Sequence, residues 1–220
     1  MNPSFFEAHQ IRLIQAPMAG SQNHQLAAAV FKAGGMGSIP AAMLTSEQLK
    51  NELVAFQNNI STCADANSWE GSLPVNVNFF CHTPPAAQAE KELAWRAKLA
   101  STYLALGIDP QSVGSGPGRA PFSEESLTLI GQIKPAVVSF HFGLPKAEWV
   151  QQIKAWGIQI WSSATTVQEA QWLAQNGADA VIAQGLEAGG HRGMFLTEDL
   201  STQMGTLALL PQIKKAVNIP

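Results

Sequence analysis

A glycine-rich segment near the end of the sequence carries an ionisable ring in a setting suited to proton transfer. The stretch AVIAQGLEAGGHRGMF (180–195) begins as an apolar run and then breaks into glycines around His191. Glycines let the backbone approach a ligand closely and expose N–H donors. An imidazole that titrates near neutral pH can take up a proton or stabilise an anion. His191 is therefore the candidate catalytic residue, the alternative being a surface or packing histidine.

Polar side chains in other apolar runs are further candidates. Asn78 lies in LPVNVNFF (73–80), where an amide is costly unless it finds a partner, either the backbone or a ligand. Gln184 ends the apolar run before the glycine-rich segment, and its amide can donate and accept hydrogen bonds to a heterocycle. His141, in SFHFG, fits a hydrogen-bonded core histidine better than a catalyst.

Two other stretches offer weaker signals. QAPMAGS (15–21) ends an apolar run at Pro17 and is either a plain turn or a flat backbone ledge for a planar ring. The pair Cys81–His82 has no third residue at metal-ligand spacing, so we predict no metal site. The two cysteines form no Cys-x-x-Cys motif, so we expect neither a disulfide framework nor a zinc site.

The elements that must position these residues alternate between short apolar runs and helical patterns. Strands are expected at 13–18, 36–40, 73–80, 136–142, 158–164 and 180–183. Helices are expected at 23–35, 45–57, 84–106, 123–133, 145–156, 166–177 and 198–216, the last broken near Gly205. Alternating strands and helices with apolar strands predict a parallel α/β sheet.

Capping signals support two of these helices. Thr45 is followed three residues later by Gln48, which is the capping-box pattern at a helix start. Thr166 and Glu169 have the same spacing at the start of a later helix. Both pairs therefore support a helix that opens with the threonine, at 45 and at 166.

Two architectures fit an alternating α/β chain. A doubly wound sheet needs a phosphate-binding glycine turn after its first strand, and the candidate MAGSQNH has no G-x-G-x-x-G. A TIM (β/α)8 barrel places functional residues in the loops after its strands, where Gln184 and His191 lie. We therefore expect a single barrel domain over residues 1–220. Six strand–helix units are counted against the eight of a full barrel, so we expect truncation after about six units.

Composition narrows the class of protein. Of 220 residues, 46% are hydrophobic and 13% charged, with a formal net charge of -3. A nucleic-acid or anionic-membrane binder would need a basic excess, so we expect neither partner. The N-terminal MNPSFFEAHQ lacks a signal-peptide pattern, and no apolar run is long enough to span a bilayer. A cytoplasmic protein is expected, and assembly into a homo-oligomer is left open.

Five stretches together resemble the nitronate monooxygenase family, formerly called 2-nitropropane dioxygenases. They are QAPMAG near the start, GGMGSIPAAML (34–44), NVNFF (76–80), VVSFHFGLP (137–145) and QGLEAGGHRG (184–193). The resemblance implies a TIM barrel with non-covalent FMN. It also implies oxidation of alkyl nitronates with O2 to carbonyl compounds and nitrite, without a metal or a reduced nicotinamide.

The resemblance also assigns residues. His191 corresponds to the family's base or nitronate partner. The positions that match flavin-contacting residues are Met18, Asn78, Gln184, Gly189 and Gly190. The family holds the flavin phosphate in loops after strands seven and eight, which this sequence does not contain. Two alternatives stay open: a related FMN-dependent enoyl-acyl-carrier-protein reductase, disfavoured by SFHFGLP and NFFCH, and an inactive fragment that binds no flavin.

Overall fold

The computed structural model describes residues 5–220 except 64–65, 67–68, 70, 87 and 115–118. The chain forms two compact units. The main unit comprises Met1–His82 and Ala120–Pro220, and the second unit is Thr83–Arg119. The second unit contains helix α4 (Ala89–Ala105), and the Arg96 guanidinium donates a hydrogen bond to the Val113 carbonyl within it.

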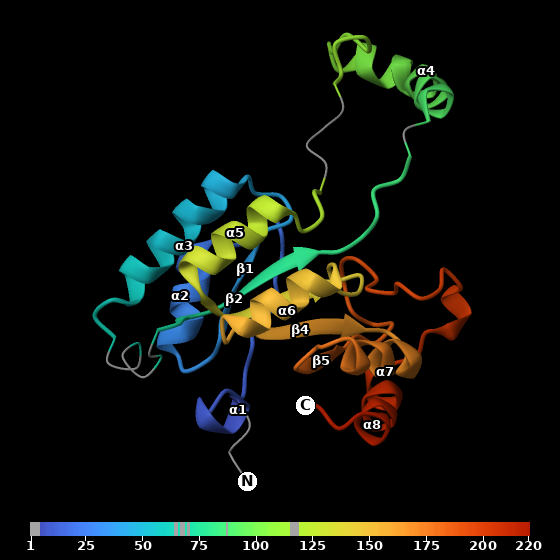
Figure 1. Ribbon diagram of the computed structural model, residues 1–220. Helices are drawn as coiled ribbons and strands as arrows, with labels where there is room; N and C mark the ends of the chain where they lie inside the picture. Colours follow the sequence, from blue (N-terminus) through green and yellow to red (C-terminus); the bar gives the residue numbers. More distant parts are fainter. Residues whose placement is uncertain (1–4, 64–65, 67–68, 70, 87, 115–118) are drawn as a thin grey trace. The chain divides into compact units, whose positions relative to one another are not determined.

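The main unit is built on a parallel sheet in which the strands lie in sequence order, β1-β2-β3-β4-β5 (Figure 1). The strands are β1 (Gly37–Pro40), β2 (Leu73–Phe80), β3 (Pro135–His141), β4 (Gln159–Ala164) and β5 (Ala180–Ala183). All four strand pairs are parallel. Sequential parallel strands with intervening helices are the order of a β/α barrel. The expected α/β class is therefore confirmed, and the described strands form an open sheet.

The expectation of a strand at 13–18 is wrong. Ile14 makes a single parallel bridge with Met36, flanked by hydrogen bonds from Met36 N to Leu13 O and from Gln15 N to Met36 O, each 2.9 Å. Pro17 lacks an N–H and cannot continue the ladder. The described sheet therefore has five strands and one bridge in place of six strands.

The last residues of the chain run beside the other edge of the sheet. Val181 in β5 donates its backbone N–H to the Pro220 carbonyl at 2.9 Å. This contact lies where a barrel would place its next strand. The edge strand β1 and the edge strand β5 are separated by the whole width of the sheet.

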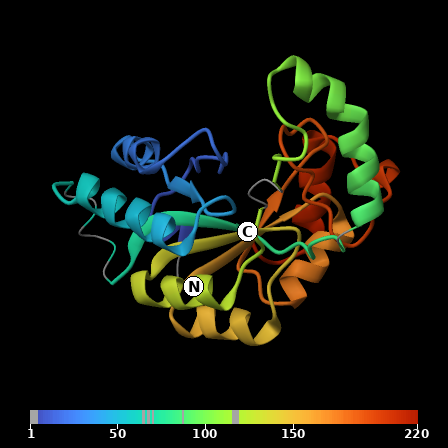
Figure 2. The ribbon, with the colours of Figure 1, turned by 90° about the horizontal axis from the view of Figure 1, so that it is seen from above.

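Apart from the short α1 (Phe5–Ala8) and η2 (Leu200–Thr202), the helices of the main unit form an arc outside the strands (Figure 2). Each expected helix of this unit is present, with ends shifted by a few residues. The expected helix at 198–216 is divided, and Gly205 is the N-cap of its second part. The helices are α1 (Phe5–Ala8), α2 (His24–Lys32), α3 (Ser46–Ile60), α5 (Glu124–Ile133), α6 (Ala147–Ala155), α7 (Val167–Gln175), the 3₁₀ helix η2 (Leu200–Thr202) and α8 (Thr206–Ala216).

Alternation along β2 separates a packing face from an inner face. Val75, Val77 and Phe79 are buried in the core that the sheet shares with α2, α3 and α5. Successive side chains of a strand point to opposite faces. Asn76, Asn78 and Phe80 are therefore on the inner face, which is the face that a barrel encloses. The alternation along β2 thus places its two polar side chains, Asn76 and Asn78, on the face that can line a site.

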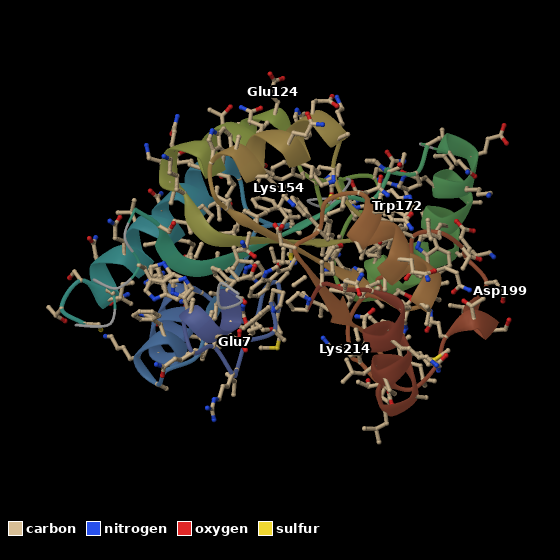
Figure 3. All side chains as sticks on the ribbon, turned by 60° about the horizontal axis from the view of Figure 1, so that its bottom comes forward. Glu7, Glu124, Lys154, Trp172, Asp199 and Lys214 are labelled. Carbon is tan, nitrogen blue, oxygen red and sulfur yellow. The ribbon has the colours of Figure 1, made fainter. Side chains whose placement is uncertain are left out.

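Two contacts set the geometry at the start of β4 and β5. Trp161 of β4 is covered by helix α1, since the ring of Phe6 stacks on it with centroids 5.1 Å apart. Lys154 of α6, labelled in Figure 3, donates from Nζ to Asp179 Oδ1 at 2.7 Å. The other carboxylate oxygen of Asp179 accepts from Ile160 N at 2.9 Å, so one residue ties α6, β4 and the turn into β5.

In the described part of the chain, no helix is both long and apolar enough to cross a membrane.

Candidate active site

The glycine-rich segment after β5 is held by the side chain at the end of that strand. Gln184 Nε2 donates to the His191 carbonyl at 3.0 Å, and Gln184 Oε1 accepts from Gly193 N at 2.7 Å. One amide therefore holds the two peptide groups that flank Arg192, directly after the histidine. Arg192 stabilises the same segment from within, because its guanidinium donates to the carbonyls of Gly185 and Leu186 at 2.9 and 2.8 Å.

A second histidine contacts this segment from β3. His141 Nε2 lies 3.0 Å from the carbonyl oxygen of His191, and since a carbonyl only accepts, Nε2 carries the proton. Burial lowers the pKa of His141, and the hydrogen bond to His191 opposes this effect. The expectation of a hydrogen-bonded histidine is confirmed. Its partner is the very residue singled out as the candidate catalyst.

The close approach of these two elements requires a glycine. A Cβ placed on Gly193 would lie 2.6 Å from Cε1 of the His141 ring. Gly190 has φ +76°, a left-handed conformation that favours glycine. A Cβ on Gly189 would have no atom within 4 Å, so this position opens onto free space. The glycines therefore have different roles. The missing side chain at Gly193 lets the His141 ring approach the backbone, whereas Gly189 borders open space.

The ring of His191 is exposed and lies against aromatic side chains. Its centroid is 5.2 Å from that of Phe80 and 6.1 Å from that of Phe142. Phe142 has φ +68°, which is unusual for a side chain of this size and marks local backbone strain. The strained turn after β3 thus places Phe142 beside His141 and His191.

Asn78 has found a partner on the neighbouring strand. Its Nδ2 donates to the hydroxyl of Ser139 at 3.0 Å and to the Ser139 carbonyl at 3.3 Å. Asn78 and Ser139 are also register partners in the β2–β3 pair. The Nδ2 donor of this amide is therefore satisfied within the inner face, which offsets part of the cost of burying it.

Met18 is the site candidate from the opposite edge of the sheet. Its side chain is 47% exposed, and its backbone carbonyl accepts from Ser21 N at 3.1 Å in a turn. The described contacts bring together His141, Gln184 and His191, and separately Asn78 and Ser139. They do not place Met18 in either group.

The sequence interpretation missed a buried carboxylate behind the segment. Glu169 was expected to cap α7 together with Thr166, and Thr166 Oγ1 does accept from Glu169 N at 3.1 Å. The carboxylate itself, however, bonds Thr165 and the backbone amides of Phe195 and Leu196. A capping pattern in the sequence could not show that second set of partners.

Metal and thiol chemistry receive no support from the described residues. Among them, no group of three or more histidine, cysteine or acidic side chains could hold a metal ion. Burial raises the pKa of the Cys81 thiol strongly, which keeps this thiol protonated and poorly nucleophilic. The site is therefore one of imidazole rings, an amide bracket and aromatic walls.

Comparison with protein families gives a match over nearly the whole chain. A family model described as nitronate monooxygenase matches residues 4–220. A nitronate monooxygenase of Paraburkholderia phytofirmans is 37% identical over 209 residues, and one of Pseudomonas aeruginosa is 38% identical over 210 residues. Each alignment covers 94% of this chain but only 54% and 56% of the two relatives. The chain thus spans about half the length of the curated relatives it matches.

Solved structures agree with this result. A nitroalkane oxidase from Streptomyces ansochromogenes superposes with a TM-score of 0.81 at 33% identity, over 98% of this chain and 58% of that one. FabK from Thermotoga maritima superposes with a TM-score of 0.63 at 21% identity, which shows a shared fold.

Proposed function

The chain belongs to the nitronate monooxygenase family, and on that premise we propose that it carries the proton-handling half of an FMN-dependent enzyme that oxidises alkyl nitronates with O2 to carbonyl compounds and nitrite. The observation that carries the proposal is the placement of His191. The imidazole is exposed to a small substrate, and Gln184 and His141 hold the backbone of its segment in place. The ring is therefore positioned before the substrate binds.

The inner edge of the sheet offers features that fit the flat ring of a flavin. Gly189 opens onto free space, and Met18 is exposed on the turn at the first edge. His82 Nδ1 is buried without a hydrogen-bond partner among the described residues, beside Phe80 and Phe142. An unpaired buried nitrogen at a site edge is a group that a ligand can satisfy. FMN, when bound, would supply the redox chemistry that the side chains of the chain lack.

The contacts of Asn78 and Gln184 change what each would contribute to a flavin. Gln184 already bonds His191 and Gly193, so we assign it to holding the segment, with its remaining N–H directed to a ring. Asn78 Nδ2 is engaged by Ser139, which leaves its Oδ1 as the acceptor for a ring N–H. Both residues would then have one hydrogen-bonding group available to hold the ring.

The phosphate end of FMN finds no comparable set of donors in this segment. Arg192 is the cation nearest His191 in sequence, and both of its hydrogen-bonding nitrogens are directed at backbone carbonyls. We therefore propose that Arg192 and this segment do not hold the phosphate. Binding of FMN by this chain alone would then depend on contacts to the flavin ring, including those of the aromatic side chains Phe80 and Phe142.

Within this reaction, we assign His191 to removing the proton that converts a neutral nitroalkane to a nitronate. Phe80 and Phe142 flank the imidazole and would exclude water from one side of the substrate. The test is to supply FMN, add a preformed alkyl nitronate, and follow nitrite release and O2 uptake with and without NADH. Nitrite formation that needs no NADH supports the proposal, and flavin reduction by NADH alone would favour the reductase alternative.

A further inference from the structure

Glu169, on the first turn of α7, is a fully buried carboxylate that the proposed chemistry does not use. Glu169 is 0% exposed, and the ion pairs found among the described residues do not include it. A buried carboxylate is costly unless hydrogen bonds replace its hydration. The partners of Glu169 must therefore account for its presence.

Four donors surround the two carboxylate oxygens. Oε2 accepts from Thr165 N at 2.7 Å and from Thr165 Oγ1 at 2.8 Å. Oε1 accepts from Phe195 N at 2.7 Å and from Leu196 N at 3.3 Å. One oxygen thus bonds the start of α7, and the other bonds the backbone at the end of the segment that carries His191.

This arrangement differs from an ordinary helix cap. In a capping box the third residue of the helix returns a hydrogen bond to the N-cap backbone. Here Thr166 is the N-cap, whereas the carboxylate bonds the residue before it, Thr165. The remaining oxygen is free to reach across 26 residues of sequence to Phe195. Capping α7 therefore does not explain the second half of the contacts.

We propose that Glu169 is a positioning residue that fixes the orientation of His191 by clamping Phe195 and Leu196. Gln184 and His141 hold the segment at residues 191 and 193. Glu169 holds it two residues further on, so the backbone that follows the imidazole-bearing residue is secured at His191 and Gly193 and again at Phe195 and Leu196.

A neighbouring apolar contact shares this end of the segment and must be separated from the effect of the carboxylate. The Phe195 ring lies against Trp172 of α7, labelled in Figure 3, with centroids 5.2 Å apart. The same ring would be 3.2 Å from a Cβ on Gly143. Ring packing locates the side chain of Phe195, whereas the carboxylate fixes its backbone amide.

The test is amide hydrogen exchange of the chain with E169Q and the matched control T166A. In E169Q an NH2 group replaces one of the two accepting oxygens. We expect it to face the N–H groups of Phe195 and Leu196, which then lose their acceptor and exchange about tenfold faster or more. T166A removes the N-cap side chain of the same helix but leaves the carboxylate contacts. We therefore expect the exchange rates of the Phe195 and Leu196 amides in T166A to stay the same as in the wild type, even if amides of α7 exchange faster.

A spectroscopic readout connects the tether to the histidine. In E169Q the Cε1–H resonance of the His191 ring should broaden or split, because the imidazole samples several orientations, whereas T166A should retain one sharp resonance. Equal behaviour of the two variants, or an E169Q variant with unchanged exchange and an unchanged resonance, would overturn the proposal.

The wild-type chain provides a second test that does not depend on how E169Q folds. If the carboxylate clamps the segment, the Phe195 and Leu196 amides must exchange as slowly as the α7 amides. Exchange at the rate of an open loop would refute the clamp. The role given to His191 rests on the function proposed above, whereas exchange and resonance are measured without substrate or flavin, so the two proposals can fail separately.

Discussion

The Nε2–H of His141 donates a hydrogen bond to the backbone carbonyl of His191 at 3.0 Å. This bond joins the end of β3 to the segment after β5, which lies 50 residues later in the chain. It requires a proton on Nε2 of His141, and it leaves the His191 ring free for a substrate. His141 therefore holds the segment, whereas His191 is the residue proposed to meet the substrate. The two histidines should respond differently to pH and to mutation.

Acid should weaken the folded state through His141. Burial lowers its pKa below the ordinary value of 6.5, so the unfolded chain binds this proton more readily than the folded one. The contribution to stability is complete above the ordinary value and is lost as the pH falls through the lowered one. We expect the melting temperature of the wild type to fall as the pH is lowered from about 6.5 to about 5, and less so for H141Q.

The pKa of His9 is also lowered by burial and acts in the same direction. Because His9 is present in both proteins, the difference between the two melting curves isolates His141. Parallel pH dependence in wild type and H141Q would contradict the assignment.

Replacing His191 should separate proton removal from later steps. With FMN supplied, H191N should lose turnover of neutral nitroalkanes by about 10²–10⁴-fold, since positioned acid–base groups contribute about that much. Turnover of a preformed nitronate should fall less, because no proton has to be removed. Steady-state rates with the two forms of one substrate give the comparison, and unchanged nitroalkane rates would remove His191 from the proton step.

Flavin binding to the isolated 220-residue chain should not depend on the phosphate. Arg192 is hydrogen-bonded to Gly185 and Leu186, so we expect FMN and riboflavin to bind with similar Kd values. Fluorescence titration of each flavin measures this ratio. FMN binding that is tenfold tighter, about 1.4 kcal/mol, would reveal a phosphate site within these residues.

Two glycines of the same segment should respond differently to alanine. G193A would force a methyl group to within 2.6 Å of the His141 ring, and overpacking of this kind costs about 1–3 kcal/mol. G189A adds a methyl group where no atom lies within 4 Å, so it serves as the control. Thermal unfolding should show a loss for G193A alone, and the opposite order would show that the segment adopts another conformation.

The open edges of the sheet should promote association. Leu13 is 61% exposed at the first edge and Ile182 is 40% exposed on β5. Unpaired strand edges with exposed apolar side chains favour pairing with another chain. Light scattering should show association that increases with concentration and that I182K reduces. V54K, on the exposed face of α3, is the matched control, and an equal effect of both variants would exclude the edge.

Local sequence signals located most of the elements. The apolar runs at 73–80 and 180–183 became β2 and β5 with the expected bounds, because turn-forming residues flank them. The capping box of Thr45 and Gln48 is present in full, since all of its partners lie within one helical turn. Sequence also indicated His191 as the chemical group, through the glycines on either side of it.

Partners distant in sequence were decided by the tertiary structure alone. The segment at 13–18 has the residues of a strand, but a ladder needs a neighbour with matching donors, and Pro17 ends it after one bridge. The amide of Gln184 is predicted to contact a flavin, and only the folded segment shows that His191 and Gly193 also lie within its reach. The carboxylate of Glu169 found its second pair of donors at Phe195 and Leu196 only because α7 packs beside that segment. Hydrogen bonds across 26 or 50 residues depend on how elements pack, and periodicity along a chain does not encode that packing.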